Sequence, residues 1–272
     1  MKDQTDLGRM AAGIRRTVIE QSWCAHVGHI GSSLSIADVL AALYGATLRS
    51  KGGDDPDRDR FILSKGHAVL ALYAALRETG HLSDEDLSTY CADGSELSGH
   101  PEHALGPVEL STGSLGHGLP VGAGLALGAR LRASRSRVFV LMSDAECNEG
   151  SVWEAAMFAA HHRLANLLAI VDVNGQQALG RTRDVLDLEP LAARFEAFGW
   201  GAREVDGHDP VAVAGELEAL GAGAGRPQVL LARTTFGKGV AYMENELQWH
   251  YWPMSKDQYG QALQQLDADA SQ

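Results

Sequence analysis

The sequence predicts an α/β fold in which helices cover both faces of a doubly wound, mostly parallel sheet. Residues 137–142 (RVFVLM), 166–173 (NLLAIVDV) and 228–235 (QVLLARTT) are continuously apolar runs, as strands buried on both faces are. Helical patterns separate these runs, and alternating strands and helices indicate parallel crossover connections. The chain has 272 residues, of which 45% are hydrophobic. That size suits one large domain, and we expect residues 1–272 to form it.

The first half of the chain is mostly helical in pattern. A helix is expected to open at Ser33 or Ser35, because Asp38 then lies in its first turn, where an acidic side chain is favourable. Residues 97–115 show no period and are expected to be a loop. The helices expected in this half cover residues 10–25, 34–48, 68–77 and 119–132, with a short apolar run at 60–64.

The second half alternates between the two periods. Residues 201–205 form a weaker strand beside the three strong ones. The glycine-rich stretch 221–227 (GAGAGRP) is interpreted as the loop between the last helix and the last strand, not as a linker between domains. The helices expected here cover residues 150–163, 189–198 and 210–220.

Charge and composition exclude several function classes. A net charge of −12 makes the chain a poor binder of nucleic acid or of anionic membranes. The first 16 residues mix charges of both signs, unlike a targeting signal, and the apolar stretch 115–129 is too short to span a membrane. Cys24, Cys91 and Cys147 have no metal-binding spacing. We therefore expect a cytoplasmic protein in a reducing compartment, without a disulfide framework or a zinc site.

One acidic run imitates a metal-binding loop. Asp55, Asp57 and Asp59 alternate as the ligands of a calcium loop do, but Arg60 stands where that loop needs a glycine. We therefore interpret the run as a solvated acidic turn.

Polar side chains follow two of the strong strands. Asp144 comes just after the strand at 137–142, and Asn174 just after the strand at 166–173. One crossover separates them, so both are expected at the carboxyl edge of the sheet, where open α/β sheets bind ligands. Carboxylate and amide oxygens suit Mg²⁺ or Ca²⁺, and the helix that follows Gly150 can face an anion with its N-terminus. These features favour a clamp for a diphosphate, although both residues are also ordinary turn formers.

Several motifs occur together in one order. The segment 143–156 (SDAECNEGSVWEAA), followed by Asn174, resembles the thiamine diphosphate motif of transketolases. The resemblance covers nearly the whole chain. Further matching segments are residues 28–35 (GHIGSSLS), 59–68 (DRFILSKGHA), 99–102 (GHPE), 112–118 (TGSLGHG), 238–240 (KGV) and 243–245 (MEN).

This resemblance implies a binding site for thiamine diphosphate and Mg²⁺, or Ca²⁺, in the diphosphate-binding domain of that fold. It implies that the side chains of Asp144 and Asn174 and the backbone carbonyl of Gln176 hold the metal. It also implies two groups of cofactor-binding residues. Gly113, Ser114 and Leu115 would line the pyrimidine, and the N–H of Ala145, together with His67 and His250, would contact the diphosphate.

The resemblance also implies the catalytic residues. His29, His100 and His250 would face the substrate, where imidazoles donate, accept and move protons near neutral pH, and His67 would act beside them. Glu149 would serve both catalysis and cofactor binding, because acidic residues at the positions of Glu149 and Glu154 connect two cofactor sites across a subunit interface in this family. Glu149 would in addition favour the N-terminus of the helix that follows it.

The same resemblance implies that the chain is the N-terminal subunit of a split transketolase. The pyrimidine-binding domain is then expected on a separate C-terminal subunit, in an α₂β₂ assembly that moves a two-carbon ketol unit from a ketose or ketose phosphate to an aldose. The alternatives are another thiamine diphosphate enzyme subunit, similar to the α subunit of 2-oxo-acid dehydrogenases, and a catalytically impaired partner protein.

Three segments depart from the family pattern. Ser143-Asp144-Ala145 replaces Gly-Asp-Gly, and Ile30 stands where proline is usual. Residues 249–253 (WHYWP) carry Tyr251 and Trp252 where the family has glycine and small residues beside the histidine. These aromatic rings are expected to narrow the substrate mouth. We therefore expect a sugar other than the usual pentose phosphates and a role in a specialised biosynthetic pathway.

Overall fold

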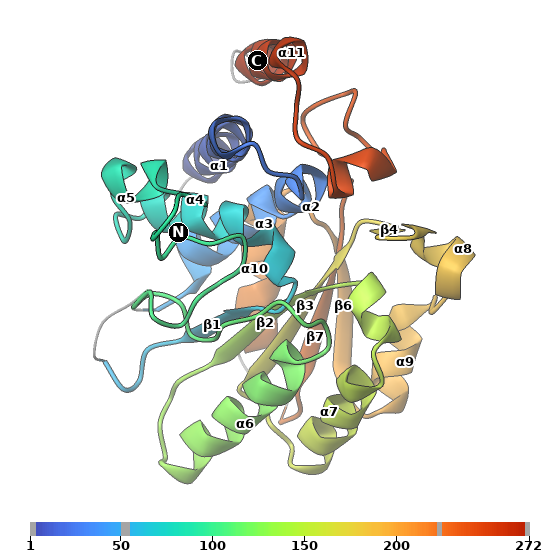
Figure 1. Ribbon diagram of the computed structural model, residues 1–272. Coiled ribbons are helices and arrows are strands. Elements are labelled where there is room, and N and C mark those ends of the chain that lie inside the picture. The colour runs from blue at the N-terminus through green and yellow to red at the C-terminus, as the bar shows by residue number, and fades with distance from the viewer. Residues whose placement is uncertain (1–3, 50–54, 222–224, 270–272) are drawn as a thin grey trace.

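The carboxyl ends of five parallel strands form one edge of a twisted sheet in the computed structural model, which describes residues 4–49, 55–221 and 225–269. Each strand pairs with its neighbours in parallel, in the order β1-β2-β3-β7-β6 (Figure 1). The three continuously apolar runs are the three inner strands, so the expected fold class is confirmed. The strands are β1 (Arg60–Leu63), β2 (Val138–Ser143), β3 (Leu167–Val173), β6 (Gly201–Asp206) and β7 (Gln228–Arg233).

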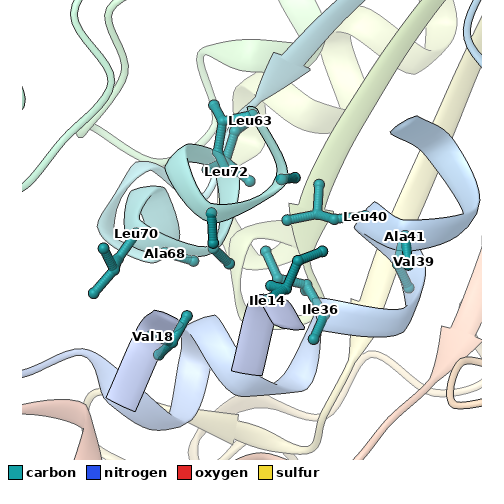
Figure 2. Packing of buried hydrophobic residues seen from close by; sticks show 14 of the residues in the cluster. Ile14, Val18, Ile36, Val39, Leu40, Ala41, Leu63, Ala68, Leu70 and Leu72 are labelled. Carbon is teal, nitrogen blue, oxygen red and sulfur yellow. The ribbon is translucent and has the colours of Figure 1, made fainter. Parts of the chain in front are cut away.

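Side chains of the inner strands enter two separate cores because they alternate between the two faces of the sheet. Phe139 and Leu141 pack into the core under α1, α3, α4 and α10, part of which Figure 2 shows. Val138 and Val140 pack into the core under α6, α7 and α9. The bounds of these helices are α1 (Gln4–Ala25), α3 (Ala37–Ala42), α4 (Val69–Glu78), α6 (Gly118–Leu131), α7 (Gly150–His161), α9 (Leu191–Ala197) and α10 (Pro210–Gly221).

The helix expected at 34–48 starts earlier and is broken. It begins as α2 (Ile30–Ser35), restarts as α3 after Ile36, and ends in a π-helical turn at Leu43–Thr47. The hydroxyl of Ser35 donates to the Ser32 carbonyl at 3.0 Å and to the Asp172 carboxylate at 2.8 Å. The Ser35 side chain therefore bonds to strand β3 at the point where the regular helix stops.

Several short elements lie outside the sequence prediction. They are α5 (Asp84–Ser88), the hairpin of β4 (Gln176–Gln177) and β5 (Gly180–Arg181), α8 (Thr182–Leu186), a 3₁₀ turn at Leu247–His250, and α11 (Lys256–Asp269). The loop expected at 221–227 falls partly on residues 222–224, outside the described residues. In the part of the chain that the structure describes, no helix is long and apolar enough to cross a membrane.

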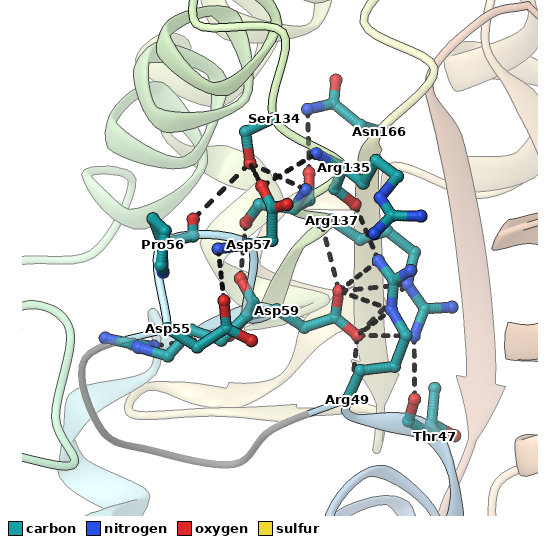
Figure 3. A network of polar contacts seen from close by, with 12 residues as sticks. Thr47, Arg49, Asp55, Pro56, Asp57, Asp59, Ser134, Arg135, Arg137 and Asn166 are labelled. Atoms are coloured by element: carbon teal, nitrogen blue, oxygen red, sulfur yellow. Dashed lines mark hydrogen bonds and ion pairs between the residues drawn. The ribbon is translucent and has the colours of Figure 1, made fainter.

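The turn expected to be solvated is partly buried. Asp55 is exposed, but the carboxylate of Asp59 is fully buried and accepts hydrogen bonds from Arg49 and Arg137, the shortest at 2.8 and 2.5 Å (Figure 3). Burial opposes ionisation of Asp59, but the hydrogen bonds from Arg137 and Arg49 hold its pKa below the ordinary value. The interpretation of Asp59 as a solvated residue was wrong because two arginines enclose it, Arg49 from ten positions before it and Arg137 from 78 positions after it. This network ties the amino ends of β1 and β2 together.

Candidate active site

The site lies at the carboxyl ends of β2 and β3. Ser143 and Asp172 are register partners, so the two strands deliver Asp144 and Asn174 to the same edge. Both residues, with Gln176, line one cleft of about 430 Å³. The structure therefore brings together the three residues that the sequence proposed as metal ligands.

Asp144 is held in place by the loop that carries the other two. Its Oδ2 accepts from the Gly175 N–H at 3.0 Å and from the Thr182 hydroxyl at 2.9 Å. Its Oδ1 accepts from the Ala145 N–H at 2.9 Å. Burial and the nearby charge of Asp172 raise the pKa of Asp144 to about 6. Among the described residues no cationic side chain forms an ion pair with Asp144, so a divalent cation in the cleft would supply the missing positive charge.

The Asn174 amide has a fixed orientation. Its Nδ2 donates to Oδ2 of Asp172 at 2.8 Å, and its Oδ1 accepts from the Gln176 N–H at 3.0 Å. Because an ionised carboxylate only accepts hydrogen bonds, Asp172 selects the amide flip that leaves the oxygen of Asn174 on the side of the Gln176 loop. That oxygen is the donor a hard cation needs.

Asp172 and Lys65 form a buried ion pair beneath the cleft. The Lys65 Nζ donates to Asp172 at 2.5 Å, and both side chains are fully buried. Thr234 also donates to Asp172, and Lys65 donates to the Ser32 carbonyl at 3.1 Å. Sequence reasoning missed both residues as members of the site. The available signal was a single acid inside the otherwise apolar strand LLAIVDV.

Three histidines from distant segments form a cluster. The ring centroids of His29, His67 and His250 lie 5.2–5.3 Å apart in each pair. Burial lowers the pKa of all three, and that of His250 falls to about 4. The Nδ1 atoms of His29 and His250 are buried and have no hydrogen-bond partner in the described part of the chain. The cluster is therefore neutral at pH 7 and has free hydrogen-bonding positions.

His100 lies beside this cluster but is exposed. Its positive charge, when present, lowers the pKa of His29. A Cβ built on Gly113 would lie 3.2 Å from the His100 ring, so the glycine lets the ring approach the loop of residues 113–115. In that loop Gly113 and Ser114 are exposed and Leu115 is half-buried.

A buried glutamate fixes the loop of residues 113–115 at its end. Glu146 accepts from the Gly116 N–H at 2.8 Å and from the hydroxyl of Ser64. Burial raises the pKa of Glu146. From the other side, the Ser151 hydroxyl donates to the Gly116 carbonyl at 2.8 Å. Glu146 is a further residue that the sequence did not single out, because its partners come from separate segments.

The remaining proposed residues, Ala145, Glu149 and Glu154, belong neither to the lining of the cleft nor to the histidine cluster. The Ala145 N–H, proposed to contact a diphosphate, bonds to Asp144. After Asp144 the chain makes a 3₁₀ turn at Ala145–Asn148 before α7 begins. Glu149 precedes α7 and is exposed. It packs against Gly116, since a Cβ added to that glycine would lie 2.6 Å from the Cβ of Glu149. Glu154 is exposed further along α7.

Comparisons with known proteins identify similar sequences and folds. Residues 8–272 match the thiamine diphosphate-binding domain of transketolase. The chain is 39% identical to an apulose-4-phosphate transketolase subunit of Phocaeicola vulgatus, covering 93% of this chain and 90% of the relative. It is 35% identical to a 6-deoxy-6-sulfo-D-fructose transketolase subunit of a Clostridium species, covering 99% of both.

Solved structures show the same relationship for the fold. A Pichia stipitis transketolase in complex with sedoheptulose 7-phosphate superposes with a TM-score of 0.88 at 29% identity, covering 99% of this chain and 41% of that one. The Campylobacter jejuni transketolase gives a TM-score of 0.86 at 27% identity, covering 98% and 43%. The chain thus spans about two fifths of the length of these transketolases.

Proposed function

This chain belongs to the transketolase family, and from that premise we propose that it is the N-terminal, thiamine diphosphate-binding subunit of a split transketolase. It would transfer a two-carbon ketol unit from a ketose donor to an aldose acceptor. The observation that carries the proposal is the convergence of Asp144, Asn174 and Gln176 on one cleft at the carboxyl edge of the sheet. Relatives of nearly equal length that are named as transketolase subunits support it.

The residues present fit a divalent cation. Asp144 is a buried carboxylate without a cationic partner in the described residues, and burial and the charge of Asp172 raise its pKa. Asn174 has its oxygen on the side of the Gln176 loop. We propose that both side chains and the Gln176 carbonyl hold Mg²⁺, because an all-oxygen set suits a hard cation. Thiamine diphosphate, when bound, supplies the carbanion chemistry that breaks and forms the carbon–carbon bond.

The protein's share of the reaction is positioning and proton handling. Burial keeps His29, His67 and His250 neutral, so each ring can accept a proton at one nitrogen while donating from the other. The hydroxyl of Ser32 lies 2.8 Å from Nε2 of His67 and fixes that ring. The Nδ1 atoms of His29 and His250 are buried and lack a hydrogen-bond partner among the described residues, although both rings are only partly buried as a whole. We propose that His29, His250 and the exposed His100 bind and deprotonate substrate hydroxyls.

We further propose that the sugar is not one of the usual pentose phosphates and that the protein acts in a specialised biosynthetic pathway. Tyr251 and Trp252 are 50% and 67% exposed beside His250, and we propose that they narrow the mouth of the histidine cluster. Two relatives of this length are named for unusual sugars, apulose 4-phosphate and 6-deoxy-6-sulfofructose. This supports a substrate with a different carbon skeleton or acid group.

The proposal requires a second polypeptide with the pyrimidine-binding domain, in an α₂β₂ assembly. The test mixes the full chain with a candidate C-terminal transketolase polypeptide, thiamine diphosphate, Mg²⁺ and a panel of ketose donors with an aldose acceptor. Ketol transfer is expected only when both chains are present, and Asp144→Asn should lower it at least tenfold. Asp84→Asn, at a carboxylate 79% exposed, is the matched control and should have no effect.

The other outcomes separate the alternatives. Transfer by the isolated chain would contradict the split-enzyme proposal. Cofactor binding that calorimetry detects, together with no turnover of any donor, would indicate a catalytically impaired partner protein. Decarboxylation of 2-oxo acids would instead indicate a subunit similar to those of the 2-oxo-acid dehydrogenases.

A further inference from the structure

The hairpin that carries Gln176 is small and needs support from its surroundings. It pairs Gln176 with Arg181 and Gln177 with Gly180, leaving Ala178 and Leu179 at the tip. Two-stranded hairpins of this size are marginal in water. Leu179 is 77% exposed, so packing contributes little to the tip.

Other contacts hold the base of the hairpin. Gly175 and Thr182 flank it, and both donate to Oδ2 of Asp144. The Gln176 Nε2 donates to the Asn245 carbonyl at 3.0 Å. These bonds fix the two ends of the hairpin but not its turn.

Tyr251 holds the tip. Its hydroxyl donates to the Ala178 carbonyl at 2.7 Å, across 73 positions of sequence. Its ring also lies against the ring of His250, with the centroids 5.1 Å apart. The tyrosine therefore joins the hairpin to the segment that carries a histidine of the cluster.

The backbone of Tyr251 is itself fixed. A Cβ on Gly28 would lie 2.3 Å from the Tyr251 carbonyl oxygen, so the two backbones are in direct contact one residue before His29. Only a residue without a side chain fits there. Tyr251 is thus anchored on one side and reaches the hairpin on the other.

We propose that Tyr251 is a positioning residue that fixes the hairpin, and with it the Gln176 carbonyl, relative to the histidine cluster. The proposal rests on the function proposed above, because it assigns the Gln176 carbonyl to the metal. The residue stands where the sequence departs from the family pattern. The hydrogen bond from its side chain would then hold the loop that we assign to the metal.

The test measures hydrogen exchange of the full chain with and without the hydroxyl. Tyr251→Phe keeps the ring and removes only the bond to Ala178. The backbone amides of residues 175–182 are expected to exchange about fivefold faster, which is the effect of one lost hydrogen bond. The matched control is Tyr242→Phe, which removes a bond of the same length, 2.7 Å, to the Gln258 carbonyl and should leave these amides unchanged.

A second measurement connects the hairpin to the metal. In Tyr251→Phe the Mg²⁺ concentration for half-maximal thiamine diphosphate binding should rise about threefold or more. The melting temperature of this variant should be the same as that of the Tyr242→Phe control. Raising Mg²⁺ should restore cofactor binding fully. A role in folding alone would lower the melting temperature without changing the Mg²⁺ requirement.

The two proposals fail in different ways. Unchanged exchange at residues 175–182 in Tyr251→Phe overturns the positioning role, whether or not the wild-type chain binds cofactor. If the wild-type chain binds no cofactor even with its partner, the proposed function fails, and the exchange measurement still decides whether Tyr251 fixes the hairpin. Equal Mg²⁺ requirements in wild type and Tyr251→Phe, where the wild type does bind, refute the connection to the metal.

Discussion

Asp172 receives hydrogen bonds from Ser35, Lys65, Asn174 and Thr234, which come from four segments of the chain. Only the bond from Asn174 reaches a proposed metal ligand. The others satisfy the remaining lone pairs of a carboxylate that no water reaches. A buried charge is tolerated only when it is paired and hydrogen-bonded in this way. The buried carboxylate is therefore held by Asn174 and Thr234, which line the cleft, and by Ser35 and Lys65, which are not among its lining residues.

Removing the charge of Asp172 alone should be more harmful than removing both charges of the pair. Asp172→Asn leaves Lys65 buried and unpaired, and the free energy of unfolding should fall by about 3–5 kcal/mol. Lys65→Met with Asp172→Asn buries no net charge and should recover most of that loss. Urea unfolding followed by circular dichroism measures both. A double variant no more stable than the single one would contradict the pairing.

At the level of elements, the strands were the most predictable part of the molecule. The sheet buries β2, β3 and β7 on both faces, so uninterrupted apolar runs remained visible in the sequence. The predicted helix at 34–48 was wrong in its start and continuity, because the bond from Ser35 to Asp172 depends on a residue in a distant strand. The helix α11 was missed: it packs on α1 through the stacked rings of Trp23 and Tyr259, a tertiary contact without a local signal.

The core between α1, α3 and α4 provides a test at this scale. Leu40 in α3 is fully buried in the cluster of Figure 2. Leu40→Ala should lower the free energy of unfolding by about 3 kcal/mol, because it leaves a cavity in a closely packed region. Leu131→Ala, at a side chain 77% exposed, should change it by less than about 0.5 kcal/mol. Chemical denaturation of both variants checks the difference, and equal effects would refute the packing argument.

Across the whole molecule, the two ends of the sheet have different tasks. The amino ends of β1 and β2 are tied by Asp59 to Arg49 and Arg137, whereas the carboxyl ends carry the cleft and the histidines. The sequence indicated the second end because strand-end polar residues and loop histidines carry local signals. It held no indication of Asp59, Lys65 or Glu146 as organising residues, because a buried ion pair or hydrogen bond between distant segments has no pattern in either partner alone.

The neutral histidine cluster makes the stability of the whole chain depend on pH. Burial lowers the folded-state pKa of His250 to about 4, whereas an exposed histidine titrates near 6.5. Between these values the histidine binds a proton in the unfolded chain but not in the folded one, so its contribution to the free energy of unfolding falls as the pH falls from about 6.5 to about 4. The raised pKa of Asp144 contributes in the opposite direction over part of this range. We expect the contribution of His250 to fall by about 3 kcal/mol over this range, because one pKa unit corresponds to about 1.4 kcal/mol. A separate loss of unfolding free energy begins below about pH 4. The pKa of Asp59 is lowered in the folded state, so its ionised carboxylate stabilises the fold until the falling pH protonates it.

Replacing the titrating ring separates these two contributions. Relative to the wild type, His250→Gln should gain unfolding free energy steadily as the pH falls from about 6.5 to about 4, and this difference should stay constant below about pH 4. His161→Gln, at an exposed histidine of α7, is the control and should follow the wild-type curve. Urea unfolding at closely spaced pH values resolves the two ranges, because the two groups titrate in different windows. If His250→Gln loses stability over the upper range as steeply as the wild type, then burial of His250 is not the cause.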